Sequence, residues 1–157
     1  MRSINYSIDA PDIVKGVAET FRKKLKKKTK FALNMPLRSA ERRNKPSDIV
    51  LFFFPVVSRT GTDIDAAIKN INHSKPVILV VLHHTFDPEA VVSESKKFVK
   101  REHTLTVDCL FYEDKGLLQC KRNDKALAEA KEWLKSTKSE LKKRRRSGQH
   151  KESSTKS

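Results

Sequence analysis

The sequence from Asp48 to Pro55 reads DIVLFFFP, and the sequence from Pro76 to Leu82 reads PVILVVL. Neither segment alternates between apolar and polar residues, so each predicts a strand that is buried on both faces. Such strands occur where helices cover both faces of a parallel sheet. These two segments therefore predict the centre of an α/β domain.

Weaker strand and helix signals alternate on either side of this centre. The other predicted strands are Ile4–Ile8, Phe31–Leu33, Thr104–Tyr112 and a short hairpin extension at Leu117–Cys120. The predicted helices are one that begins after Asp9, then Asp63–Ile71, Pro88–Lys100 and Lys125–Leu134. Alternating strands and helices predict a three-layer, flavodoxin-like domain with a mostly parallel five-stranded sheet in the order 2-1-3-4-5.

Charge divides the chain into three parts. Residues 1–46 contain 13 basic and 4 acidic residues, residues 47–137 contain 13 of each, and residues 138–157 contain 8 basic and 2 acidic residues. The last part has only Leu141 as an apolar residue, which is typical of disordered tails. We therefore expect an α/β domain over residues 1–137 and a disordered basic tail over residues 138–157.

The basic ends predict an anionic partner. The tail contains the run Lys142-Lys143-Arg144-Arg145-Arg146, which is typical of nuclear localisation signals and of nucleic-acid-binding patches. A solvated charged tail is the simpler alternative, but a second basic cluster at residues 22–28 weakens it. Nucleic acid or another polyanion is therefore a predicted partner, bound through its backbone without sequence preference.

A turn after the first central strand is the best candidate for a small-ligand site. Ligands of open α/β sheets bind at the carboxyl ends of the strands, where helix N-termini favour anions. The candidate residues for binding an anion or a nucleotide-like molecule are Ser58, Arg59, Thr60, Gly61 and Thr62. An ordinary capped turn with an exposed arginine is the alternative interpretation.

The same region resembles the nucleoside 2-deoxyribosyltransferase family, which belongs with TIR-like Rossmannoid domains. The resemblance covers the apolar strand from Asp48, the segment Gly61-Thr-Asp-Ile-Asp65 and the segment Lys75-Pro-Val-Ile78. It implies that the family's catalytic glutamate corresponds to Asp65. The chain departs from the pattern there, with Asp for Glu, and at Ser74, which stands where the family has glycine.

His84 is a second candidate catalytic residue, because it ends the other central strand and histidine can transfer protons near neutral pH. A half-solvated histidine at a strand end is the alternative. The histidines and cysteines lack the spacing of metal ligands, so we expect no metal site, and no cofactor motif is present.

Two functions are compatible with these patterns. The first is a non-catalytic intracellular binding or signalling module whose basic termini hold a nucleic acid or an acidic protein. The second is an enzyme that cleaves N-glycosidic bonds or transfers deoxyribosyl groups with the Gly61 turn and Asp65. We favour the first, because no acid–base constellation is complete.

No segment is long and apolar enough to span a membrane, so we expect a cytoplasmic or nuclear protein. The oligomeric state is left open.

Overall fold

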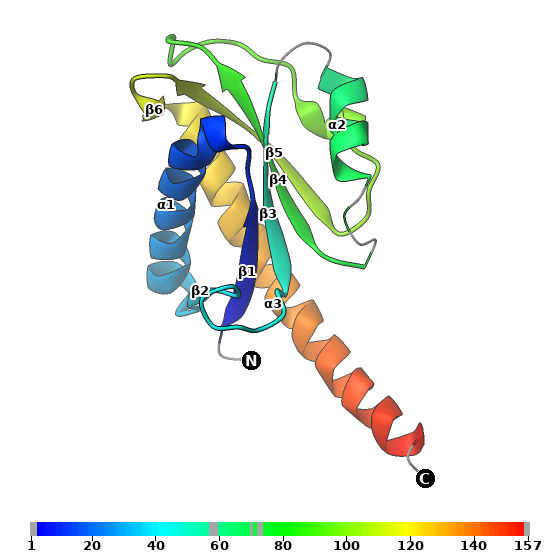
Figure 1. Ribbon diagram of the computed structural model, residues 1–157. Helices are drawn as coiled ribbons and strands as arrows, with labels where there is room; N and C mark the ends of the chain where they lie inside the picture. The colour runs from blue at the N-terminus through cyan, green and yellow to red at the C-terminus, as the bar shows by residue number, and fades with distance from the viewer. Residues whose placement is uncertain (1–2, 57–59, 70, 72–73, 156–157) are drawn as a thin grey trace.

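One sheet organises the computed structural model, which describes residues 3–56, 60–69, 71 and 74–155 (Figure 1). Its strands are β1 Ile4–Asp9, β2 Leu37–Ser39, β3 Ile49–Pro55, β4 Val77–His84, β5 Thr104–Tyr112 and β6 Gly116–Leu117. They lie in the order β2-β1-β3-β4-β5-β6, and every neighbouring pair is parallel except the antiparallel pair β5 and β6. The predicted order of the first five strands is confirmed, and β6 adds a short sixth strand.

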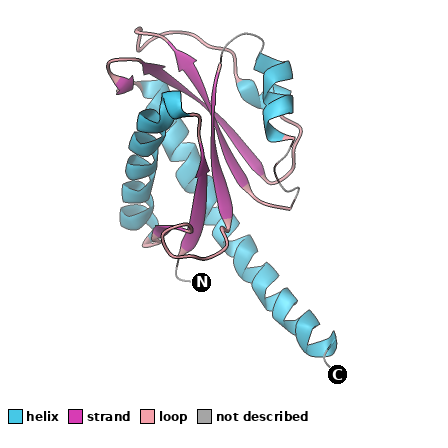
Figure 2. Ribbon diagram, in the orientation of Figure 1, coloured by secondary structure: helices cyan, strands magenta, loops and turns pink. Residues whose placement is uncertain are grey.

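Helices cover both faces of the sheet, which confirms the three-layer α/β class (Figure 2). The helix α1 (Lys15–Leu33), preceded by the 3-10 turn η1 (Asp12–Val14), lies on one face beside α3 (Lys121–Thr155). The helix α2 (Thr60–Ile68) and the 3-10 turn η2 (Ser95–Phe98) lie on the other face.

Strand alternation divides the core between the two faces. In β4, Ile78, Val80 and Leu82 point towards α1 and α3 and belong to the larger apolar cluster. Their neighbours in β4 point the other way and pack with Ile64 and Ile68 of α2 in a smaller cluster. The apolar residues Val77–Leu82 of β4 are thus fully buried on both faces, as the continuous apolar sequence predicts.

The predicted strand at Phe31–Leu33 is wrong, because α1 continues through these residues. The helix ends at Asn34, which adopts the left-handed conformation that asparagine tolerates at helix ends. The second strand is instead β2, which follows the end of α1 by a few residues. At the other end, α1 begins at Lys15 rather than directly after Asp9, which belongs to β1.

The predicted helix at Pro88–Lys100 is also wrong. Only η2 is helical in this segment, and Val91, an apolar residue that a helix packed on the sheet would bury, is 93% exposed. Neighbouring β-branched valines lose side-chain freedom in a helix, which disfavours that conformation here. The backbone N–H of Ser95 instead donates a hydrogen bond to the carboxylate of Asp108 in β5, so the segment is tied to the sheet.

The first turn of α3 is fixed to the sheet by a buried asparagine. The amide oxygen of Asn123 accepts a hydrogen bond from the backbone N–H of Leu110, and its amide nitrogen donates to the carbonyl oxygens of Leu110 and Leu118. Asn123 therefore takes the place of a neighbouring strand at the outer edge of β5. This bridge sets the position from which α3 runs back across the sheet beside α1.

The helix α3 is longer than the predicted Lys125–Leu134 and continues past the expected domain boundary at residue 138. Among the side chains of α3 that the structure describes, which run to Lys143, the buried apolar positions end with Leu134 and the last buried residue is Thr137. Beyond this point the helix projects away from the sheet (Figure 1). A helix without packing is marginally stable in water, so the disorder and dispensability of residues 138–157 stay a prediction.

We expect a chain truncated after Thr137 to unfold within about 2 °C of the full-length protein, because none of the described side chains from Lys138 to Lys143 is buried. Truncation after Lys131 provides the control, since it also removes the fully buried Leu134. That control should lower the melting temperature by about 4 °C or more, as expected for the loss of about 2–5 kcal/mol. Thermal unfolding followed by circular dichroism measures both, and a drop of several degrees in the first variant would show that the tail packs on the domain.

Candidate functional site

The predicted anion-binding turn is only partly described. Ser58 and Arg59 lie outside the described residues. Thr60, Gly61 and Thr62 form the first turn of α2 rather than a loop that precedes it. Backbone N–H groups of a first helical turn have no partners within the helix, so anion binding at this end of α2 stays a prediction.

The two candidate catalytic residues lie on different faces of the sheet. Asp65 is exposed on α2, directly after Ile64, which is buried against the sheet. His84 belongs to the set of β4 side chains that point towards α1 and α3, and its ring contacts the ring of Phe111, with 5.3 Å between centroids. The structure does not bring Asp65 and His84 together, and a catalytic role for either stays a prediction.

His84 lies in a small aromatic group at the carboxyl end of β4. Its ring also lies against Tyr112, with 5.1 Å between centroids, and its Nε2 is 3.6 Å from a carboxylate oxygen of Glu113. The side chain is 44% exposed. These contacts fit the alternative interpretation, a strand-end histidine that is partly solvated.

The neighbouring histidine takes part in a buried network that the sequence did not predict. His83 Nε2 lies 2.8 Å from Asp108 Oδ1, and the Ser95 hydroxyl donates a hydrogen bond to the same oxygen at 2.6 Å. The backbone N–H of Ser95 donates to Asp108 Oδ2 at 3.0 Å. A single carboxylate thus joins β4, β5 and η2.

The hydrogen bonds of this network connect three parts of the fold, and they do not activate Ser95 as a nucleophile. Burial alone would raise the pKa of Asp108, but the hydrogen bonds from His83 and Ser95 outweigh it and hold this pKa below its ordinary value. The hydroxyl of Ser95 donates to the carboxylate, and the residue is only 1% exposed. A serine nucleophile needs its hydroxyl to face a base and a substrate, so the arrangement favours a structural role.

The sequence contained one signal for this network, the charged residue Asp108 in the middle of a strand. A charge within a strand is compatible with an edge strand, and only the two-residue β6 lies outside β5 in the sheet. The missing information was that the segment after β4 is not a helix. Because Pro88–Lys100 was predicted to be a helix, the pairing of Ser95 with Asp108 was not predicted.

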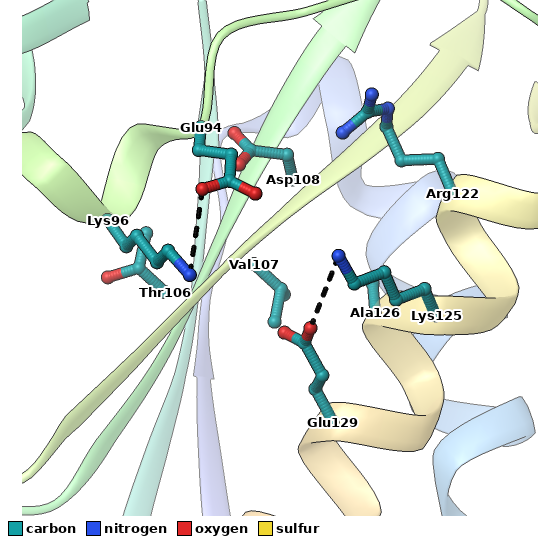
Figure 3. A pocket seen from close by; sticks show the side chains of 9 residues that line it. All are labelled: Glu94, Lys96, Thr106, Val107, Asp108, Arg122, Lys125, Ala126 and Glu129. Atoms are coloured by element: carbon teal, nitrogen blue, oxygen red, sulfur yellow. Dashed lines mark ion pairs between the residues drawn. The ribbon is translucent and has the colours of Figure 1, made fainter.

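A small hollow of about 40 Å³ lies beside Asp108, between η2 and α3 (Figure 3). An ion pair stands on each side of it. Lys96 lies 3.6 Å from Glu94 on one side, and Lys125 lies 3.9 Å from Glu129 on the other. Positive and negative side chains balance here, so the hollow has no charge that would select an anion or a cation.

The two basic segments, in contrast, meet on one face of the molecule. The helices α1 and α3 contact each other and bury their apolar stripes in the same cluster. The basic residues of the second half of α1 are Arg22, Lys23, Lys24, Lys26, Lys27, Lys28 and Lys30. Those of α3 up to residue 143 are Lys121, Arg122, Lys125, Lys131, Lys135, Lys138, Lys142 and Lys143, of which Arg122 and Lys125 line the hollow beside Asp108. We call the outer surface of these two helices the basic layer.

The basic layer makes the molecule electrically asymmetric. The helix α1 carries eight basic residues and one acidic residue, and α3 up to residue 143 carries eight and four. Residues 60–103, which include α2 and η2 on the opposite face, carry six of each. The side chains of Arg144, Arg145 and Arg146 are not among those described, although their backbone continues α3.

Comparisons with known proteins assign no function to this arrangement. No protein-family model, curated protein or solved structure matches the chain. The resemblance to nucleoside 2-deoxyribosyltransferases therefore stays a prediction. Within the described ranges, the helices lack any stretch with the length and hydropathy needed to cross a membrane. Histidine, cysteine and acidic side chains in those same ranges form no group of three suited to a metal ion.

We expect Asp108→Asn to lower the melting temperature at pH 7 by a few degrees, as for a loss on the order of 1 kcal/mol. A carboxylate whose pKa is lowered in the folded state stabilises above its unfolded pKa, near 3.8, and loses that contribution as the pH falls through the folded value. The deficit of the variant should therefore be constant from about pH 5 to pH 7 and shrink below about pH 4.

The exposed carboxylate of Asp65 offers a matched control for this substitution. Asp65→Asn should change the free energy of unfolding by less than about 0.5 kcal/mol at pH 7. Melting curves recorded from pH 3 to pH 7 test both variants. An Asp108→Asn protein as stable as the wild type at pH 7 would contradict a stabilising role for the network.

Proposed function

We propose that this protein is a non-catalytic module that binds nucleic acid through its basic layer. The observation that carries the proposal is the placement of α1 and α3 side by side, where Lys24, Lys27 and Lys28 of α1 line one groove with Lys131 of α3. A cluster of lysine and arginine on one face is the electrostatic footprint of a nucleic-acid-binding protein.

The charges of the basic layer are available to a partner. Within the described part of the chain, Lys24, Lys27 and Lys28 form no ion pair with a carboxylate. Each can release a counterion from a phosphate when the partner binds, which makes the free energy of binding strongly dependent on salt. Lysine contacts of this type position a phosphate backbone and do not read base edges, so the binding has no sequence preference.

An acidic protein is the other polyanion that suits this surface, and the sequence patterns do not separate it from nucleic acid. Nucleic acid is favoured because its charges are regularly spaced along a line, as are the lysines of a helix. The enzymatic alternative, in which the Gly61 turn and Asp65 act on a nucleoside or nucleotide, has no additional support from the described residues.

We expect the triple variant Lys24→Gln, Lys27→Gln, Lys28→Gln to bind a duplex more weakly than the wild type. The slope of log K against log salt should become less steep by about 0.9 for each lysine that contacts a phosphate, up to about 2.7. Lys96→Gln, Lys97→Gln, Lys100→Gln is the matched control, because it removes the same charge from the opposite face. Fluorescence anisotropy at several salt concentrations measures both slopes.

Two results would overturn the proposal. One is the absence of duplex and single-strand binding by the wild type at low salt. The other is an equal loss of affinity in the two triple variants, which would show that net charge alone governs binding and that the basic layer is no defined interface. Circular dichroism spectra of all variants establish that they are folded.

The run Lys142 to Arg146 leads to a separate prediction about localisation. If it is a nuclear localisation signal, the full chain should accumulate in nuclei, and alanine at all five positions should abolish that accumulation. Fluorescence microscopy of tagged chains measures the nuclear fraction. The prediction fails if the alanine variant and the wild type have the same distribution.

A further inference from the structure

A groove between the two helices of the basic layer contains an exposed aromatic ring. The hollow has a volume of about 440 Å³. Its lining comprises Lys24, Lys27, Lys28 and Phe31 from α1 together with Asp124, Leu127 and Lys131 from α3. Both helices therefore contribute to one site, which the sequence analysis did not identify.

The lining of α1 follows from helical periodicity. The positions 24, 27, 28 and 31 recur every three or four residues, so they lie along one face of the helix. At 1.5 Å per residue, Lys24 and Phe31 are separated by about 10 Å along the axis. The groove thus has lysines along its length and a phenylalanine towards the carboxyl end of α1.

Phe31 is unusual among the large apolar residues of this surface. Its side chain is 77% exposed, whereas Leu127, which faces the same groove, is only 3% exposed and belongs to the core. Burying Phe31 would remove apolar area from water, which favours a partner with a flat apolar face. A partner that covers this ring must also tolerate four lysines and a single aspartate.

We propose that this groove binds single-stranded nucleic acid, with an unpaired base stacked on Phe31 and the flanking phosphates contacted by Lys24, Lys27 and Lys28. The proposal rests on the nucleic-acid-binding function and specifies its ligand. A base offers a flat face for the ring and its strand offers charges for the lysines, so one ligand satisfies both features of the groove. Asp124 is the one carboxylate in the lining and opposes the phosphates there.

Single strands suit this groove better than duplexes or acidic peptides. The bases of a duplex are stacked on one another inside the helix, so their faces are not available to Phe31. An acidic peptide supplies negative charge without a flat ring. Stacking between a base and an aromatic side chain tolerates every base, because each base has a π face, so the site discriminates strand state rather than sequence.

The experiment compares Phe31→Ala with the wild type on three fluorescent probes: an oligothymidylate of about 20 nucleotides, an abasic strand of the same length and a duplex of that length. Phe31→Ala should raise the Kd for oligothymidylate at least about five-fold, which corresponds to the lower limit of one stacked base. Affinities for the abasic strand and the duplex should change less than about two-fold, and the salt slope should be preserved, because the phosphate contacts remain.

Two further substitutions at Phe31 and one distant variant separate stacking from general effects. Phe31→Trp keeps an aromatic face and should retain the wild-type affinity, whereas Phe31→Leu is apolar without a ring and should behave like Phe31→Ala. Phe86→Ala removes another exposed aromatic ring, 73% exposed and adjacent to Tyr112, and should leave all three affinities unchanged. Because Phe31 is exposed, all its variants should have melting temperatures close to that of the wild type.

The failure of this inference is distinguishable from the failure of the proposed function. If the wild type binds the duplex and the single strand but Phe31→Ala loses less than about two-fold on oligothymidylate, the basic layer binds nucleic acid and the stacking site is refuted. An equal loss on all three probes likewise refutes stacking. If the wild type binds none of the nucleic acids and instead binds polyglutamate, both proposals are wrong and the partner is an acidic protein.

Discussion

The apolar side chains Ile78, Val80 and Leu82 of β4 determine where the charges of this protein lie. The helices α1 and α3 both bury their apolar stripes in the cluster that these three residues form with neighbouring strands. Helices that share one face of a sheet must lie beside each other, and their polar sides must then face outward together. The juxtaposition of the two basic segments therefore follows from core packing, without any attraction between them.

Two polar networks position the helices and turns around this core. Asn123 satisfies the outer backbone groups of Leu110 and so fixes the start of α3 against β5. Asp108 holds η2 against the other face through Ser95 and His83. Each network places a buried polar group where its hydrogen bonds are met, which is the condition under which such groups stabilise a fold. His83, Ser95 and Asp108 are residue types that are common in catalytic sites, but here their hydrogen bonds to one another connect parts of the fold.

The central strands and the order of the first five strands could be predicted from the sequence, because uninterrupted apolar runs and alternating elements constrain an α/β fold strongly. The failures have local causes. Phe31–Leu33 is a short apolar segment that suits either a strand or the last turn of a helix, and the left-handed Asn34 marks the helix end only once the backbone is known. The spacing of Val91, Val92 and Ser95 is compatible with a helix, but Ser95 instead donates a hydrogen bond to Asp108 of a strand that is distant in the sequence. A contact between residues that are distant in the chain produces no pattern in the local sequence around Ser95.

Only the positive charge of the basic layer could be predicted from the sequence. Basic composition predicts a polyanion as the class of partner, but it does not predict which surface of the protein binds that partner. The structure shows on which side of the sheet the excess positive charge lies. It lies on α1 and α3, whereas residues 60–103, which include the helical segments on the opposite face, carry equal numbers of basic and acidic residues. An asymmetric charge distribution orients a protein towards a polyanion before contact, and this steering raises the rate of association. Because salt screens such fields over about 10 Å at 0.1 M, steering acts only near the partner. In the complex that we propose, close contacts must then set its lifetime, and Phe31 is the exposed side chain of the basic layer whose proposed contact with a base does not depend on charge.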